Sequence, residues 1–158
     1  GFDLPVLRYR AMKYQVAAPW LYRSGDKWNN YMQRYSLDWH CDVLEVCADY
    51  GASQRIRLDE LCCLLGLPGK CGVSGGDVAS LYEKGEIQEL RDYCETDVIN
   101  TYLAYVHLMH HRGEVTDTGL EQVTDETRAF LEKHEDKQHF REFLAQWEKA
   151  GNVKMVQS

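Results

Sequence analysis

The run Tyr-Cys-Glu-Thr-Asp places a phenol, Tyr93, four residues before a carboxylate, Asp97. In a helix this spacing puts both side chains on one face, about one turn apart. A carboxylate there can hold a divalent cation, and the phenol can orient a water or hydroxide beside it. The spacing alone also fits an ordinary pair at the edge of a helical core, so the interpretation needs support from other parts of the sequence.

A second acidic residue with chemical interest stands at the start of the chain, where Gly-Phe-Asp occupies residues 1 to 3. Asp3 is a suitable helix N-cap, and Pro5 suits the first helical turn. The apolar pattern that follows continues as a helix to about Met12. Because the chain has no initiator methionine and Gly1 to Asp3 read as the end of one element and the start of the next, we expect sequence to precede Gly1.

A long helix is predicted from Glu86 to about His111, with Gly113 closing it, and this helix carries Tyr93 and Asp97. Its core-facing stripe is predicted to comprise Ile87, Leu90, Cys94, Val98, Thr101, Tyr105 and Leu108, widened by Ile99, Leu103 and Val106. Tyr93, Asp97 and Asn100 flank this stripe as a polar strip. A polar strip beside an apolar wall is where a buried metal ligand would lie.

The remainder of the sequence is predicted to be mainly helical. Residues 16–38, which contain Pro19 and Gly25, form a long loop, and residues 39–43 are a short strand. Further helices are predicted from an Asp42 cap through Tyr50, over residues 58–65 with Gly66 as the stop, over residues 77–84 with Gly85 as the stop, around residues 120–131, and around residues 140–147.

Length and composition describe one ordinary globular domain. The chain has 158 residues, of which 44% are hydrophobic and 27% are charged. No apolar run approaches the roughly 18 residues that cross a bilayer, and no signal peptide is recognisable. The cysteines, Cys41, Cys47, Cys62, Cys63, Cys71 and Cys94, form no Cys-x-x-Cys pair. Buried, reduced thiols in a cytoplasmic protein without a membrane partner are therefore predicted.

The net charge of −7 argues against nucleic-acid binding by bulk attraction, but the charge is unevenly distributed. Residues 1–57 hold eight Lys or Arg against six Asp or Glu, a net of +2, whereas the remainder has a net of −9. The first 39 residues also hold nine of the eighteen aromatic residues. These rings and the interleaved basic residues either stack single-stranded bases and bind phosphates, or divide into core rings and a solvated basic face.

Three histidines near the end of the long helix, His107, His110 and His111, include a pair at i and i+4 that can bind a metal. The helix dipole also favours imidazoles at this end. We prefer this simpler interpretation.

Other polar residues have simpler interpretations as well. Asp42 is interpreted as a helix cap rather than an acidic site residue, and Asp59-Glu60 and the acidic residues 132–136 as solvated helix faces. Lys70 lacks the glycine spacing of a phosphate-binding loop, so we assign it no nucleotide role.

The chemical motifs resemble those of a known group of nucleases. Phe2-Asp3 at the head of a helix and Tyr93-x-x-x-Asp97 resemble the second and third motifs of the DEDDy 3′–5′ exonucleases. A more specific likeness runs in order through Trp39-His40-Cys41-Asp42, Leu58-Asp59-Glu60-Leu61, Leu64-Leu65-Gly66-Leu67-Pro68-Gly69-Lys70 and Tyr93-Cys94-Glu95-Thr96-Asp97-Val98. These stretches are similar to the predicted exonuclease family related to the proofreading domain of family B DNA polymerases.

The resemblance implies an α/β, ribonuclease H-like fold in which four carboxylates hold two Mg²⁺ or Mn²⁺ ions at the 3′ end of a strand. Matched position by position, Asp3 is the second-motif carboxylate and Asp97 the third-motif metal ligand. Tyr93 is the phenol that positions the attacking water. The same likeness implies that residues 1–112 are the C-terminal part of an exonuclease domain and residues 113–158 a helical extension packed on it.

The sequence departs from the family pattern at the first motif. An Asp-x-Glu on the opening strand supplies two of the four carboxylates, and none occurs at a strand position here. The opening strands are missing too. We therefore expect a helix-dominated C-terminal portion of a longer enzyme, inactive or nearly so by itself; the alternative is that a neighbouring chain supplies the sheet.

Two functions follow from these observations. The first is a metal-dependent 3′–5′ exonuclease that acts at the 3′ end of single-stranded or frayed DNA, with RNA as the less favoured substrate. The second is a non-catalytic helical module that binds nucleic acid or a protein partner and retains a vestigial site.

Overall fold

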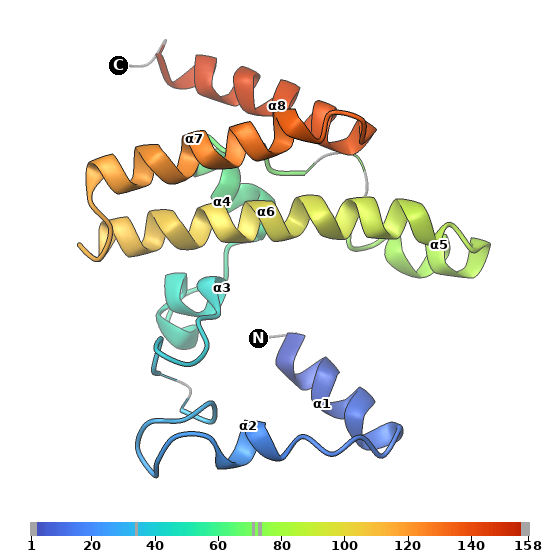
Figure 1. The fold of residues 1–158 in the computed structure, drawn as a ribbon, viewed down its shortest axis with the longest axis vertical. Helices are drawn as coiled ribbons and strands as arrows, with labels where there is room; N and C mark the ends of the chain where they lie inside the picture. Colours follow the sequence, from blue (N-terminus) through green and yellow to red (C-terminus); the bar gives the residue numbers. More distant parts are fainter. Residues whose placement is uncertain (1–2, 34, 71, 73, 156–158) are drawn as a thin grey trace. The chain divides into compact units, whose positions relative to one another are not determined.

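A computed structural model describes residues 3–33, 35–70, 72 and 74–155 of the chain (Figure 1). The described residues form α-helices and one short 3-10 helix, with no β-strand among them. The chain divides into two compact units, residues 1–56 and 57–158. The predicted helix-dominated character is therefore confirmed. The predicted boundary between residues 112 and 113 stays a prediction.

The first unit holds short helices joined by long loops. They are α1 (Asp3–Lys13), α2 (Pro19–Arg23), α3 (Val43–Cys47) and the 3-10 helix η1 (Asp49–Gly51). The helix predicted at the start of the chain is confirmed, although Asp3, its predicted N-cap, lies within α1, and α2 lies inside the segment predicted to be a loop. Pro19 starts α2 because its fixed φ suits the first helical position. The apolar residues buried here are few: Leu21, Val43 and Ala48.

The strand predicted at residues 39–43 is wrong. Residues 40–42 have no regular secondary structure, and Val43 begins α3. The carboxylate of Asp42 accepts a hydrogen bond from the backbone N–H of Glu45 at 3.1 Å, which confirms Asp42 as a helix cap. A strand must pair its backbone groups with a neighbour, and the described residues offer no partner strand, so the segment enters a helix instead.

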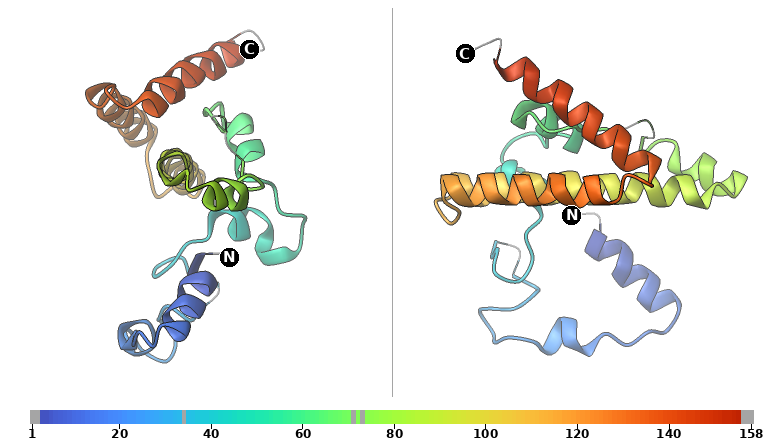
Figure 2. Two further views of the ribbon diagram at one scale, coloured as in Figure 1. Left: turned by 90° about the vertical axis from the view of Figure 1, so that its right-hand side faces the viewer. Right: turned by 45° about the horizontal axis from the view of Figure 1, so that its top comes forward.

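The second unit is built around one long helix. Its elements are α4 (Leu58–Leu65), α5 (Val78–Lys84), α6 (Ile87–His111), α7 (Asp117–Lys133) and α8 (Gln138–Met155). The other four helices all pack against α6, and α7 runs back along it (Figures 1 and 2). α4 and α5 end as predicted, because Gly66 and Gly85 adopt φ values of 74° and 77° that glycine tolerates without steric cost.

The core of this unit gathers side chains from α4, α6, α7 and α8. Its buried members are Cys62, Leu67, Leu103, Leu131, Phe140, Phe143 and Trp147. The last three lie at i, i+3 and i+7 on α8, which is the amphipathic spacing predicted for that helix. This packing holds the C-terminal helices and α6 in one unit.

The core-facing stripe predicted on α6 is mostly wrong. Ile87 and Val98 are 46% and 62% exposed, and Cys94 and Thr101 are exposed too. The buried residues of α6 are Thr96, Asn100, Leu103, Ala104, Val106 and Met109, of which only Leu103 and Val106 belong to the predicted stripe. α6 carries apolar side chains around most of its circumference, so periodicity did not identify the face that its neighbours cover. The C-terminal half is buried on several sides, although Tyr102 and Tyr105 stay exposed.

The described cysteines form no disulfide with one another, and only Cys62 among them is fully buried. Cys47, Cys63 and Cys94 are exposed, so the prediction of buried thiols was largely wrong. Cys71 lies outside the described residues. No helix in the described part of the chain has both the length and the apolar character needed to cross a membrane.

Candidate active site

Tyr93 and Asp97 meet on α6 as their spacing predicts. The phenol of Tyr93 lies beside the carboxylate of Asp97, and both side chains are partly buried. Burial raises the pKa of Tyr93 to about 12, and the neighbouring Asp97 charge adds to that effect. Tyr93 is therefore a neutral phenol throughout the physiological range, able to donate a hydrogen bond but not to act as a general base.

The charged form of Asp97 is disfavoured by its surroundings. Burial raises the pKa of this carboxyl above its usual value, and the charge of Asp59 raises it further. The hydrogen bond from Tyr93 and the charge of Lys70 act in the opposite direction without cancelling the burial. A bound cation would reverse this balance, because a positive ion beside the carboxylate favours its ionised form.

The charges of Asp59 and Lys70 both act on Asp97, although neither residue was predicted to have a functional role. The Asp59 carboxylate is 24% exposed and lies 4.0 Å from Lys70 Nζ. The interpretation of Asp59 as a solvated position is thus wrong, while Glu60 beside it does face solvent and pairs with Arg57. The available signal was spacing, since Asp59 precedes the buried Cys62 by three residues and shares its helix face.

Asn100 positions the turn that carries Lys70. Its side-chain amide is 1% exposed and donates to the backbone carbonyl of Gly69 at 2.7 Å. Asn100 lies three residues after Asp97, so this bond fixes the turn beside the Asp97 face of α6. The Oδ1 atom of Asn100 is buried and has no hydrogen-bond partner in the described structure. The predicted polar strip is therefore present, but it faces inward.

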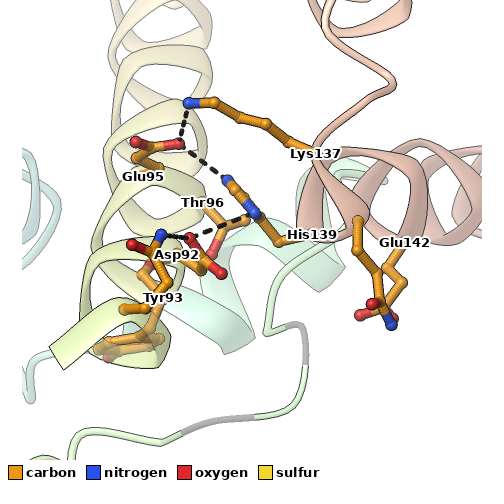
Figure 3. Close-up of polar contacts among 9 residues, drawn as sticks. Asp92, Tyr93, Glu95, Thr96, Lys137, His139 and Glu142 are labelled. Carbon is orange, nitrogen blue, oxygen red and sulfur yellow. Dashed lines mark hydrogen bonds and ion pairs between the residues drawn. The ribbon is translucent and has the colours of Figure 1, made fainter. Parts of the chain in front are cut away.

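Glu95 lies between Tyr93 and Asp97 in the sequence and faces elsewhere. Its Oε2 atom accepts hydrogen bonds from Lys137 Nζ and His139 Nε2, both at 2.8 Å (Figure 3). Asp92 contacts the other ring nitrogen of His139 at 3.5 Å. Hydrogen bonds from Lys137 and His139 hold the pKa of Glu95 below its usual value. These contacts attach α6 to the connection between α7 and the start of α8.

A cleft of about 630 Å³ opens beside Tyr93, between α5, α6 and α8. Its lining includes acidic, basic and hydroxyl side chains, among them Asp92, Tyr93, Thr96, His139 and Glu142. Figure 3 shows Tyr93 and His139 on neighbouring helices at this cleft. Tyr93 therefore contacts both the Asp97 carboxylate and an open polar surface.

Asp3, the third predicted site residue, lies in the first turn of α1 and is exposed. It belongs to the first unit, and Phe2 beside it lies outside the described residues. The site geometry described above is that of the second unit alone. The role predicted for Asp3 stays a prediction.

The donor chemistry around Asp97 suits a hard divalent cation, but the number of donors is small. Carboxylate oxygens, as in Asp97 and Asp59, are the ligands that Mg²⁺ and Mn²⁺ prefer. Among the described residues, however, no group of three or more His, Cys, Asp or Glu side chains is placed to hold a metal ion. The described part of the chain thus holds carboxylates of suitable chemistry but no set of three ligands, and the predicted metal site stays a prediction.

The histidines at the end of α6 do not add to that site. His110 Nε2 lies 2.7 Å from Asp117 Oδ1 at the start of α7, which gives this imidazole a structural partner. The pairing agrees with the simpler interpretation of these residues.

A protein-family model described as a predicted 3′–5′ exonuclease related to the exonuclease domain of PolB matches residues 1–147 of the chain. The match includes α6 with Tyr93 and Asp97, all of α7 and part of α8. No curated protein and no solved structure matches the chain. Because the match covers more than half of the chain, the chain belongs to the predicted 3′–5′ exonucleases related to the exonuclease domain of PolB.

Proposed function

We propose that this chain carries part of the active site of a metal-dependent 3′–5′ exonuclease of ribonuclease H-like fold. Its substrate is the 3′ end of single-stranded or frayed DNA, with RNA as the less favoured substrate. The observation that carries the proposal is the Tyr93–Asp97 pair on one face of α6, a neutral phenol beside a partly buried carboxylate whose charge the protein disfavours. Such an arrangement is typical of catalytic carboxylates that await a cation.

Each residue of the proposed site has a distinct role. Asp97, and by its motif position Asp3, would be ligands of Mg²⁺ or Mn²⁺, which would supply Lewis-acid stabilisation and lower the pKa of a bound water. Tyr93 orients the attacking water through its hydroxyl, which keeps its proton because its pKa is about 12. Lys70 offsets negative charge beside Asp97 and Asp59.

The two remaining carboxylates of the proposed site belong to the Asp-x-Glu motif of the family, which this sequence does not contain. We propose that the 158 residues alone have little or no nuclease activity. A longer chain that also carries the Asp-x-Glu motif would have nuclease activity. Degradation of DNA by a contaminant-free preparation of these 158 residues would contradict this part of the proposal.

A non-catalytic module that binds nucleic acid or a protein partner is the second candidate. It is favoured by the absence of any three-ligand cluster among the described residues. The two candidates differ in whether a carboxylate at position 97 is needed for activity.

A labelled-strand assay separates them. A 5′-labelled single strand is incubated with a longer form of this chain that carries the Asp-x-Glu motif, here called the Asp-x-Glu-containing protein, and with either Mn²⁺ or EDTA. The exonuclease shortens the strand from its 3′ end only with the metal, and Asp97→Ala abolishes shortening. Glu132→Ala, which removes an exposed carboxylate on α7, is the matched control and should retain full activity. Shortening that survives Asp97→Ala would refute the site assignment, and no shortening with any metal would favour the binding module.

A further inference from the structure

Aromatic rings remain exposed in residues 19–31 of the first unit, here called the tryptophan segment. Trp20 and Tyr22 are each 56% exposed and Trp28 is 77% exposed. Leu21, the aliphatic residue among them, is buried at 6%. The large apolar side chains that the segment presents to solvent are thus all aromatic.

Hydrogen bonds within the loop hold Trp28 in place. The Asp26 carboxylate accepts from the backbone N–H groups of Trp28 and Asn29 at 2.7 and 2.8 Å, and the Asp26 N–H donates to the Asn29 carbonyl at 3.0 Å. Gly25 has a φ of 83°, and a Cβ atom there would meet the Asn29 carbonyl oxygen. Asn30 closes the loop by donating to the Asp26 carbonyl at 2.6 Å. The exposure of Trp28 is therefore a feature of an ordered turn.

Contacts between aromatic side chains also support this turn. Tyr31 packs edge to face against Trp20 and against Trp39, with centroid distances of 5.5 and 5.0 Å. The indole N–H of Trp39 donates to the side chain of Asn29. Tyr31 and Trp39 thus pack against other rings, whereas more than half of Trp20 stays exposed to solvent. The segment therefore contains both packed rings and rings that a ligand can reach.

The sequence around these rings is rich in positive charge. Residues 8–31 contain Arg8, Arg10, Lys13, Arg23 and Lys27 against Asp26 alone, a net of five minus one, or +4, in a chain of net −7. The one carboxylate is engaged in the turn described above. Lys27 Nζ lies 4.7 Å from the centroid of Trp28, so a cation sits against one side of the most exposed ring.

We propose that the tryptophan segment binds single-stranded nucleic acid, with bases stacking on Trp28 and Trp20 and phosphates contacting Lys27 and Arg23. This inference deepens the proposed function, on which it rests, by naming the residues that hold the strand. Exposed rings beside cations suit this ligand because every base offers a face for stacking and every linkage a negative charge. Aromatic residues and arginine are also enriched at protein interfaces, so the excess of positive charge in residues 8–31 is what favours a polyanion over a protein partner.

Binding is measured with the 158-residue chain in EDTA, which prevents hydrolysis and separates binding from the nuclease proposal. The probe is a 5′-fluorescein thymidine oligonucleotide of about 20 nucleotides, longer than the roughly 4–16 that such sites cover. Fluorescence anisotropy gives the Kd, and tryptophan quenching reports stacking. We expect Trp28→Ala to weaken binding about 5- to 100-fold and Trp28→Phe to retain most of it. Lys27→Gln should lower the salt dependence by about one phosphate contact.

Two control variants make the result specific. Tyr82→Ala removes a ring that is 69% exposed in the second unit and should leave the Kd unchanged. Glu132→Ala, which removes an exposed carboxylate on α7, should also leave the Kd unchanged. Because binding is measured in EDTA, a failed nuclease assay and a failed stacking site give different results.

Unchanged affinity in both Trp28→Ala and Lys27→Gln would overturn the inference, as would equal losses in Trp28→Ala and Tyr82→Ala. Equal affinity for a duplex of the same length would overturn it too, because paired bases cannot stack on the rings. So would self-association that Trp28→Ala abolishes without any binding of the oligonucleotide, which would identify a protein contact instead.

Discussion

Asp97 and Glu95 are two carboxylates two residues apart on α6, and the protein treats them oppositely. Hydrogen bonds from Lys137 and His139 hold the pKa of Glu95 below its usual value. Burial raises the pKa of Asp97, and no cation in the described structure offsets that effect completely. Glu95, whose charge is stabilised by hydrogen bonds, connects α6 to the start of α8. Asp97, whose charge is disfavoured by burial, is instead the kind of carboxylate that occurs at functional sites.

The largest expected effect is on catalysis. In the Asp-x-Glu-containing protein, Asp97→Asn should lower metal-dependent exonuclease turnover by at least about 100-fold, because it removes a proposed charged ligand while preserving shape. Glu95→Gln should change turnover only a few-fold. Steady-state rates on a labelled single strand measure both. Comparable losses in the two variants would remove the functional distinction between these carboxylates.

Tyr93→Phe should have the next largest effect, a loss of roughly 10- to 100-fold in turnover with little change in fold, because only the water-orienting hydroxyl is removed. The wild-type pH–rate profile should show no limb from this phenol up to about pH 10, since the pKa of Tyr93 is about 12. A profile with an alkaline limb near pH 9 that disappears in Tyr93→Phe would show instead that the phenol ionises during turnover.

Asp97→Asn should stabilise the metal-free chain at neutral pH. A carboxyl whose pKa is higher when folded gives stability that is complete below its unfolded value of 3.8 and lost as pH rises through the folded value. Neutral pH is above that window, so replacing the charge by an amide should raise Tm by about 2–4 °C. Thermal unfolding in EDTA measures this rise, which should vanish as pH falls below 3.8. A lower Tm at neutral pH would mean that the Asp97 charge is well compensated.

Glu95→Gln should have the opposite and smallest effect. Because the pKa of Glu95 is lowered on folding, its contribution to stability is present above the unfolded value of 4.5 and lost as pH falls through the folded value. The side chain is 36% exposed, so solvent screening limits the loss at neutral pH to about 0.5 kcal/mol. Denaturant unfolding at several pH values tests this. A difference that persists at low pH would point to packing rather than charge.

Local chemistry made several elements predictable. The ends of α4 and α5 at Gly66 and Gly85 and the Asp42 cap of α3 depend on residues within one turn, so neighbouring sequence contains the information. The strand at residues 39–43 was wrong for the opposite reason, because a strand exists only with a partner. The buried face of α6 was mispredicted for a similar reason. Apolar residues such as Val98 also occur on the exposed side of the helix, so only the packing of neighbouring helices decides which side is buried.

The residues of the candidate site also fall into two groups, those that local spacing predicted and those that it did not. Tyr93 and Asp97 were recognisable because a four-residue spacing in a helix fixes their proximity, whatever surrounds them. Asp59 and Lys70 were not, because they reach Asp97 through the packing of α4 on α6 and through the bond between Asn100 and Gly69, a separation of 31 residues. Spacing thus determined which side chains share a turn. Only tertiary packing determined which charges lie beside that turn, because the energy of a buried charge depends on neighbours that no local pattern specifies.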